Sequence, residues 1–165
     1  MSKAIQIIET GGVDVMRWVD LPLKSEGPAA SEIRIKHEAI GVNYIDTYHR
    51  SGVYPVKLPC VLGLEGVGTI TAIGSNVVDF RVGDRVGYAS GPLGSYSQER
   101  DFRADGAFKI PDFIDSYKAA GLLLKGMTVE YLFNRTYKIK RGEHILFHAA
   151  AGGVGLIACQ WAKAV

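Results

Sequence analysis

A glycine-rich turn between an apolar segment and a helical segment is the feature that most restricts the fold of this chain. The apolar segment HILFHA, residues 144–149, precedes the turn AAGGVG and the helical sequence LIACQWAKA. The turn differs from the G-x-G-x-x-G fingerprint of dinucleotide-binding folds in having Ala150 at the first glycine position. Gly152 would let a pyrophosphate approach the backbone, and Gly155 would let the helix pack closely on its strand. We expect a strand, turn and helix that bind a nucleotide; a tight turn without a ligand is the alternative.

The first 110 or so residues have a different character, with short β-type runs separated by Gly, Pro and Asp. Such a series of short strands joined by irregular links is typical of a small barrel or a curled, partly open sheet. The LGLEGVG segment, residues 62–68, is expected to form either a tight bend or the wall of a site. The expected strands cover residues 3–9, 32–40, 66–74, 83–89, 94–102 and 107–110.

Helical signals are concentrated in two places. Asn43 can cap a short helix with the sequence YIDTYHRS, which Gly52 would end. A helix is expected to begin near Asp115 or Ser116, and a second one near Gly126. The second would end in the basic sequence KIKR before Gly142, where the helix dipole favours positive charge. We therefore predict an α/β fold whose N-terminal part is mainly β.

Composition excludes several classes of function. The 19 basic and 17 acidic residues are interspersed and leave a net charge of +2, so nucleic acid and membrane partners are not expected. The N-terminus reads as a first strand and not as a signal peptide. Cys60 and Cys159 are far apart and outside any metal motif, which favours reduced thiols and a cytoplasmic location.

Five motifs together resemble one family. They are AIGVNYIDTYHRSGVYP, LGLEGVGTI, VGDRVGYA, LLKGMTVEYL and FHAAAGGVGLIACQWAKA, and they occur in family order along the whole chain. The sequence resembles the N-terminal half of the zinc-independent quinone oxidoreductases, which belong to the medium-chain dehydrogenase/reductase superfamily. The resemblance implies NAD(P)H-dependent reduction of a small-molecule quinone, with NADPH as cofactor and NADH also possible.

The resemblance also implies a domain organisation. Residues 1–125 would form a GroES-like, partly open β-barrel that carries the substrate and catalytic site. Residues 126–165 would form a connecting helix and the first β-α unit of a Rossmann fold, truncated before the fold is complete. Zinc-containing relatives have a cysteine where this chain has Asn43 and a histidine where it has Leu64, so no catalytic zinc is expected. The cysteine-rich loop of their structural zinc is absent too.

The resemblance implies roles for particular residues. Catalytic or substrate-contacting roles fall on Asn43, Tyr48, Tyr54 and Lys125, with the two tyrosines as contacts or proton donors of the quinone. Thr128 and Tyr131 are three residues apart and can share a helix face. The residues implied in cofactor binding are Tyr44, Ile45, Asp46, Thr47, Tyr48, Thr128, Tyr131, Gly152, Gly153 and Val154.

Each of these residues also has a structural interpretation. Asn43 is a good helix cap, and Asp46 would stabilise the first turn of the same helix. The tyrosines and Thr128 could be packing residues, and Lys125 a solvated lysine. His148, at the end of the apolar segment, is expected to be structural and not catalytic.

Three readings of the function stay open at this point. Relatives with similar motifs reduce the double bonds of enones, alkenals or enoyl thioesters. A non-enzymatic binding or structural module is the third reading. The full-length parent is expected to be a homodimer, and the isolated 165-residue chain to bind cofactor weakly and turn over little. The residues that distinguish NADP from NAD lie ~20 positions beyond the turn, outside this sequence.

Overall fold

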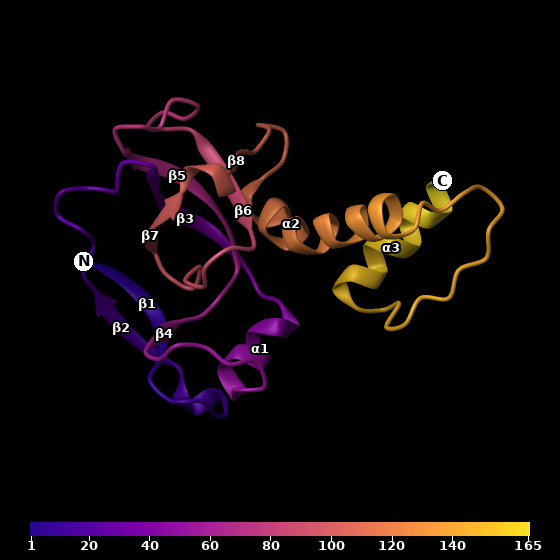
Figure 1. The fold of residues 1–165 in the computed structure, drawn as a ribbon, viewed down its shortest axis with the longest axis horizontal. Helices are drawn as coiled ribbons and strands as arrows, with labels where there is room; N and C mark the ends of the chain where they lie inside the picture. The colour runs from indigo at the N-terminus through magenta and orange to yellow at the C-terminus, as the bar shows by residue number, and fades with distance from the viewer. The chain divides into compact units, whose positions relative to one another are not determined.

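The computed structural model describes all of residues 1–165 (Figure 1). The chain forms two compact units, Met1–Gly121 and Leu122–Val165. The helix α2 (Ser116–Tyr131) contains the boundary between them.

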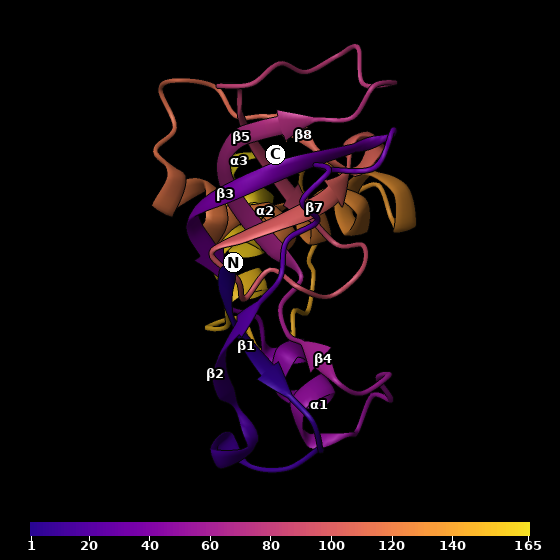
Figure 2. The same cartoon turned by 90° about the vertical axis from the view of Figure 1, so that its left-hand side faces the viewer.

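The first unit consists of two antiparallel sheets. One has the strand order β2-β1-β4 and the other β7-β3-β5-β6-β8. Figure 2 shows β1, β2, β4 and α1 at one end of this unit and β3, β5, β7 and β8 at the other. The two sheets are not closed into a barrel. This agrees with the partly open arrangement that was predicted from the sequence. The strands are β1 (Ser2–Ile7), β2 (Arg17–Leu21), β3 (Glu32–Gly41), β4 (Cys60–Val61), β5 (Glu65–Ile73), β6 (Arg85–Ala89), β7 (Glu99–Arg103) and β8 (Phe108–Lys109).

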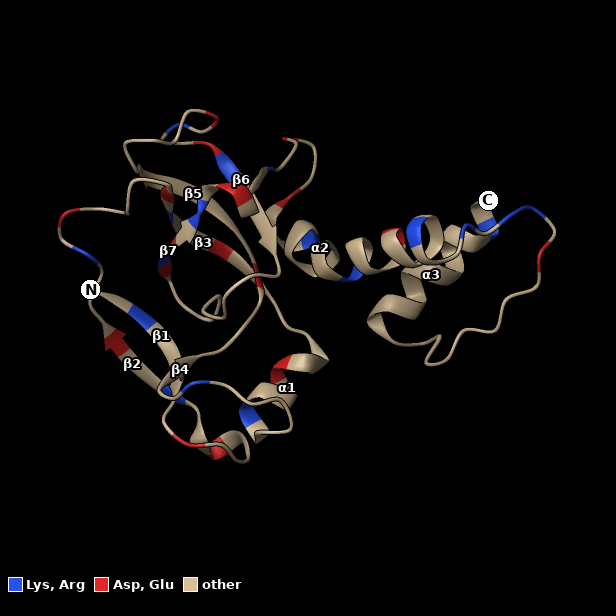
Figure 3. Cartoon of the chain, in the orientation of Figure 1, with Lys and Arg blue, Asp and Glu red and all other residues tan.

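Short helices complete this unit. The helix α1 (Tyr44–Ser51) follows β3, and Gly52 ends it in the left-handed region at φ 84°, as predicted. Two single 3-10 turns, η1 (Val13–Val15) and η2 (Ala104–Gly106), lie in the connections. Acidic and basic residues are interspersed along the ribbon (Figure 3).

One segment joins the two sheets. Ile5 of β1 donates its N–H to the carbonyl of Tyr96 (2.8 Å), and Gln98 donates to the carbonyl of Lys3 (2.8 Å). On the other side, the N–H of His37 in β3 donates to the carbonyl of Gln98 (2.8 Å). Residues 96–98 therefore hold β1 and β3 together, although neither strand pairs with the other.

The strands bury alternate residues, which explains why most of them could be predicted. Ile33 and Ile35 of β3 point into a core that includes Val86, Tyr88 and Phe102. The rings of Tyr88 and Phe102 stack with their centroids 4.2 Å apart. This pattern of one buried and one exposed face gives the period of two that the sequence shows.

Two strands and part of a third were not predicted correctly. The edge strand β2, with sequence RWVDL, was missed because it buries none of its residues fully. The strand β4 has only two residues, too few for any periodic signal. The strand predicted at residues 94–102 begins at Glu99, because Gly94 turns at φ 135° and the N–H of Ser97 bonds back to the carbonyl of Ser95.

The helices predicted after residue 115 differ from those in the structure. One continuous helix, α2, replaces the expected helices from residues 115 and 126, because a glycine weakens a helix interior by only ~1 kcal/mol and does not break it. It continues as one π-helical stretch, η3 (Leu132–Thr136). The basic sequence KIKR at residues 138–141 therefore lies beyond the helical residues and not in their last turn.

The predicted strand at residues 144–149 is also wrong. No strand is assigned there, and Leu146 is 86% exposed. A β-strand requires hydrogen bonds to a neighbouring strand, and no other segment of the chain pairs with this one. The helix α3 (Gly153–Ala164) does follow the glycine turn, and its Ala158 packs with Val129 and Phe133 in the core of this unit.

His37 is held by two hydrogen bonds in the first unit. Its Nδ1 lies 2.6 Å from the carbonyl oxygen of Ser97, and its Nε2 lies 2.8 Å from the hydroxyl of Tyr88. A carbonyl only accepts, so Nδ1 carries the proton and Nε2 accepts from Tyr88. Burial lowers the pKa of His37 to about 4 and raises the pKa of Tyr88 to about 12, so this pair stays neutral near pH 7.

The pKa of His37 predicts a loss of stability in acid. The folded pKa of about 4 is below the ordinary 6.5, so the unfolded chain takes up the proton first. This contribution to the free energy of unfolding is complete above pH 6.5 and lost as the pH falls toward 4, in total on the order of 3 kcal/mol. Urea unfolding across this range should show a flatter pH dependence for His37→Gln. His144→Gln, at an exposed histidine, is the control, and an unchanged slope in His37→Gln would contradict the assignment.

Candidate functional site

The start of α1 carries the first group of predicted site residues. β3 ends at Gly41, and Asn43 adopts the extended conformation of an N-cap before α1 begins at Tyr44. Asp46, at the third helical position, accepts a hydrogen bond from the backbone N–H of Asn43 (2.9 Å). This is half of a capping box, and it fixes the direction in which the chain enters the helix.

Asp46 is a buried carboxylate and not a solvated helix-end charge. It is 4% exposed, and its Oδ2 also accepts a hydrogen bond from the hydroxyl of Tyr96 (2.8 Å). Its Oδ1 is buried and has no hydrogen-bond partner. Burial and donation to Asp46 raise the pKa of Tyr96 well above its ordinary value, so its hydroxyl remains a donor at neutral and alkaline pH.

Asn43 is oriented by a second carboxylate. Its Nδ2 donates to Oε1 of Glu65 (2.7 Å), and Glu65, in β5, is fully buried. A carboxylate only accepts, so the amide NH₂ must face Glu65 and the flip of the side chain is determined. Gly41 is required beside this pair, because a Cβ there would overlap Oε1 of Glu65 and the carbonyl of Ala120.

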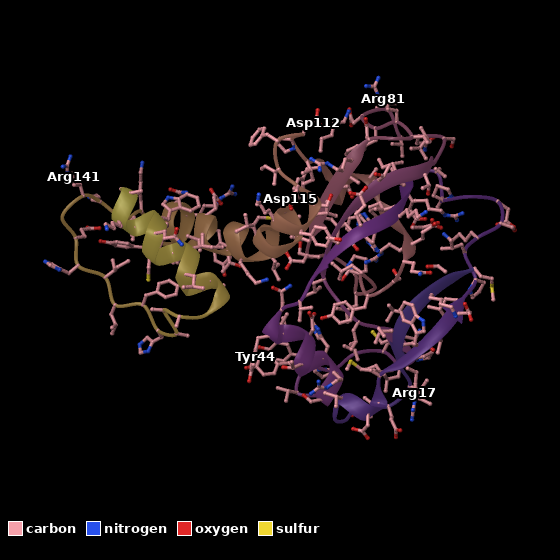
Figure 4. The ribbon with its side chains drawn as sticks, turned by 180° about the vertical axis from the view of Figure 1, so that it is seen from behind. Arg17, Tyr44, Arg81, Asp112, Asp115 and Arg141 are labelled. Carbon is pink, nitrogen blue, oxygen red and sulfur yellow. The ribbon has the colours of Figure 1, made fainter.

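Aromatic rings lie on and next to α1. The rings of Tyr44 and Tyr48 meet edge to face at 5.3 Å, and those of Tyr48 and Tyr54 are 5.2 Å apart. Tyr44 is 76% and Tyr54 47% exposed, and Tyr44 extends from the side of α1 away from β1 and β2 (Figure 4). Thr47 donates its hydroxyl to the carbonyl of Tyr44 (2.6 Å), and Ile45 is partly buried.

The second group of predicted residues lies in the second unit, at the glycine turn. A Cβ on Gly155 would lie 2.5 Å from the carbonyl oxygen of Ala149, so only glycine allows α3 to start so close to the preceding chain. Ala149 turns the backbone at φ 54°. Gly152 precedes the first helical residue in an extended conformation, and the open N-terminal turn of α3 presents backbone N–H groups.

Lys125 lies beside this turn. A Cβ on Gly153 would come within 2.9 Å of its Cδ and Cε, so the aliphatic part of the lysine covers the glycine backbone. The side chain of Val154 packs against the core of the second unit, which leaves its N–H as the group that can serve a ligand. Thr128 donates its hydroxyl to the carbonyl of Leu124 (2.7 Å), and Tyr131 is 47% exposed.

The structure thus collects the predicted residues into one group in each unit. Asn43 and Asp46 share one hydrogen-bonded network, and the three tyrosines share one aromatic cluster. Lys125 and Gly153 are neighbours in the second unit. No three side chains of the types His, Cys, Asp and Glu lie close enough together to hold a metal ion. Cys60 and Cys159 are both free thiols.

Sequence reasoning missed two members of the network, Glu65 and Tyr96. Glu65 had a usable signal, since it is the single charge within the apolar and glycine-rich segment LGLEGVGTI. Tyr96 had none, because its link to Asp46 spans 50 positions in the sequence and depends on the tertiary fold.

Comparison with known proteins identifies the protein family. The chain matches the model of the family described as "Alcohol dehydrogenase GroES-like domain" over residues 29–140. It therefore belongs to that family, and its partly open pair of sheets agrees with the GroES-like fold that the sequence predicted. No helix combines the length and the apolar character that a membrane crossing requires.

Individual proteins are similar to this chain in sequence and in structure. The chain is 51% identical over 166 residues to a quinone oxidoreductase of Pseudomonas aeruginosa, covering 100% of this chain and 50% of that protein. It is 43% identical to a 2-haloacrylate reductase of a Burkholderia species, covering 99% and 50%. The crystal structure of Escherichia coli quinone oxidoreductase complexed with NADPH superposes with a TM-score of 0.95 at 48% identity, covering 99% and 50%. The chain spans about half the length of the curated relatives it matches.

Close packing around Gly41 predicts a large cost for Gly41→Ala. The added methyl group would overlap Glu65 and Ala120, so we expect the free energy of unfolding to fall by about 1–3 kcal/mol. Gly121→Ala is the matched control, because a Cβ there meets nothing and alanine favours a helix interior. Denaturant unfolding of both variants measures the difference. Equal stability of the two variants would show that the Gly41 contact does not constrain the site.

Proposed function

We propose that the protein reduces quinones with NADPH as hydride donor, with NADH as a possible substitute, and without zinc. The observation that carries the proposal is the match to quinone oxidoreductases across the chain, including one structure that contains NADPH. The glycine turn and the exposed tyrosines give that resemblance a physical basis. The domain division at residues 1–125 and 126–165 and the homodimeric parent are part of the same proposal.

The second unit fits the pyrophosphate of a dinucleotide. Gly152 and Gly153 keep the N-terminal turn of α3 free of side chains, so an anion can approach its N–H groups. The positive Lys125 next to Gly153 adds attraction for phosphate. Thr128 and Tyr131 follow on α2; the Thr128 hydroxyl already donates to Leu124 and can accept from the cofactor, and the Tyr131 hydroxyl can accept or donate.

A separate group of residues in the first unit is proposed to contact the nicotinamide. We assign Asn43 and the segment Tyr44–Tyr48, which includes Ile45, Asp46 and Thr47, to the nicotinamide side. Bound NADPH supplies the hydride, and the remaining work is orientation and proton supply. Because Glu65 fixes the Asn43 amide, this buried side chain is held in one orientation.

The tyrosine cluster is suited to a quinone. The Tyr48 ring lies 5.3 Å from that of Tyr44 and 5.2 Å from that of Tyr54, and the exposed rings of Tyr44 and Tyr54 leave room for an aromatic ligand to pack on them. Addition of a hydride to a quinone gives a hydroquinone anion, and one proton completes the hydroquinone. We assign that donation to the hydroxyl of Tyr48 or Tyr54, which solvent can reprotonate.

Zinc is not needed for this reaction. A quinone is electron-poor, so it accepts hydride with less Lewis-acid help than a simple ketone needs. Asn43 and Leu64 occupy the positions where the zinc-containing relatives have cysteine and histidine, and neither is a zinc ligand. The Asn43 amide instead donates to Glu65.

Double-bond reduction is the second candidate. The 2-haloacrylate reductase relative, at 43% identity, reduces by its name an activated alkene. Such a substrate also accepts hydride at an electron-poor carbon and then a proton. A non-enzymatic binding module is the third candidate, and it would bind NADPH without turnover.

We further propose a cytoplasmic location and no nucleic acid or membrane partner for the parent, in line with its mixed surface charge (Figure 3). We also propose that the 165-residue chain alone binds NADPH weakly and turns over slowly, since it spans about half the length of its relatives. Rapid quinone-dependent oxidation of NADPH by this chain would contradict the second statement.

A substrate panel tests the function. The full-length protein is assayed for NADPH oxidation with 1,4-benzoquinone, 1,4-naphthoquinone, an enone and 2-chloroacrylate, and we expect the quinones to give the highest kcat/KM. Tyr54→Phe should lower kcat/KM for quinones ~10-fold through the lost hydroxyl, which corresponds to about 1.4 kcal/mol. Tyr117→Phe, 80% exposed on α2, is the control. A preference for 2-chloroacrylate would favour the second candidate, and NADPH binding without oxidation the third.

Gly152→Ala tests the cofactor site separately. The added Cβ would lie 3.1 Å from the carbonyl of Ala149, a tight contact that the fold can absorb. In the proposed site it would also crowd the backbone that the pyrophosphate approaches. We expect the Kd for NADPH to rise ~10-fold or more, a loss of at least about 1.4 kcal/mol. Fluorescence titration in the full-length protein measures it. Gly126→Ala, where a Cβ meets nothing, is the control, and an equal Kd in both variants would refute this placement of the pyrophosphate.

A further inference from the structure

Tyr96 is fixed in place by its backbone and by the surface under its ring. Its N–H donates to the carbonyl of Leu62 (2.9 Å), and its carbonyl accepts from the N–H of Ile5 (2.8 Å). A Cβ on Gly63 would overlap the Tyr96 ring, and Gly63 has φ +93°. Glycine at this position therefore lets the ring lie directly on the backbone just before β5.

The hydroxyl of Tyr96 supplies one of the two hydrogen bonds that Asp46 receives. Both the Tyr96 hydroxyl (2.8 Å) and the Asn43 N–H (2.9 Å) donate to Oδ2, and Oδ1 has no partner. A carboxylate that is 4% exposed has little water to replace a lost donor. The charges that face Tyr96 are those of Asp46 and Glu65.

The contacts form a closed chain around the start of α1. Tyr96 binds Asp46, Asp46 binds the Asn43 backbone, and Asn43 binds Glu65 through its amide. Glu65 lies two residues after Gly63, on which the Tyr96 ring rests. A displacement of Asp46 is therefore passed to Asn43 and to the first turn of α1, which carries Tyr44 and Tyr48.

We propose that Tyr96 is a positioning residue of the oxidoreductase site, acting through Asp46 to hold the Asn43 amide and the tyrosine-bearing face of α1 in register with Glu65. The inference rests on the proposed function. Tyr96 itself touches neither substrate nor cofactor in this proposal. Its hydroxyl restrains the helix that does.

Tyr96→Phe in the full-length protein is the test, because it removes the hydroxyl and keeps the ring. Loss of one of the two donors to Asp46 should partly misalign the start of α1 and lower kcat for a quinone ~10-fold. The Kd for NADPH, measured by fluorescence, should rise by a smaller factor than kcat falls, since the contacts of α1 with the nicotinamide shift while the glycine turn is unaltered. Tyr117→Phe, at an exposed tyrosine, is the matched control.

A double-mutant cycle with Asp46→Asn separates positioning from general destabilisation. If Tyr96 acts through Asp46, the double variant should lose little more kcat than Asp46→Asn alone. Additive losses of kcat would overturn the proposal. So would a Tyr96→Phe variant in which Tm falls and the Kd for NADPH rises as much as kcat falls, because that is the result of a purely structural role.

Hydrogen exchange gives a readout that does not depend on activity. In Tyr96→Phe the amides of α1 should exchange ~10-fold faster than in the wild type, while those of β3 and β5 stay protected. If the wild type reduces no quinone but α1 loosens in this way, the proposed function fails and the positioning contact stands. Unchanged exchange in α1 would overturn the positioning role even if quinone activity is found.

Discussion

Two carboxylates in the first unit, Asp46 and Glu65, lie out of water, and a buried charge is costly unless donors compensate it. Asp46 takes its donors from Asn43 and Tyr96, and Glu65 takes one from the Asn43 amide. Asn43 lies in the turn that starts α1, and Tyr96 is 50 positions from Asp46 in the sequence. The requirement to satisfy both charges therefore limits where α1 can lie on the sheets.

The helix α1 needs such a constraint. With eight residues it is shorter than the ~12–15 at which isolated helices begin to be stable, so its stability comes from caps and tertiary contacts. The capping box at Asp46 and the left-handed Gly52 define its two ends. The network below the helix determines its position, and the tyrosine rings above it remain exposed. A buried polar layer thus supports an exposed aromatic layer on one short element.

Features encoded by local sequence could be predicted, and features that depend on distant contacts could not. The strand around Ile33 and Ile35 buries alternate residues, and α1 has its cap and its glycine stop within ten residues. The edge strand β2 has no buried side to give a periodic signal, and the Tyr96–Asp46 bond joins residues 50 positions apart. The site at α1 was predicted as a set of residues. Its network was not, because Glu65 and Tyr96 contribute through tertiary structure.

The segment at residues 144–149 also shows the difference between what local sequence encodes and what distant contacts must supply. Its apolar sequence predicts a buried parallel strand, but such a strand exists only between neighbours that pair with its backbone. No segment of this chain does so, and the residues form no strand. The glycine turn after it forms nonetheless, because the contact of Gly155 with Ala149 and Ala150 is local and α3 packs on Val129 and Phe133. The geometry of the glycine turn thus depends on local contacts and on the helix that follows it, and it forms where no parallel sheet is present.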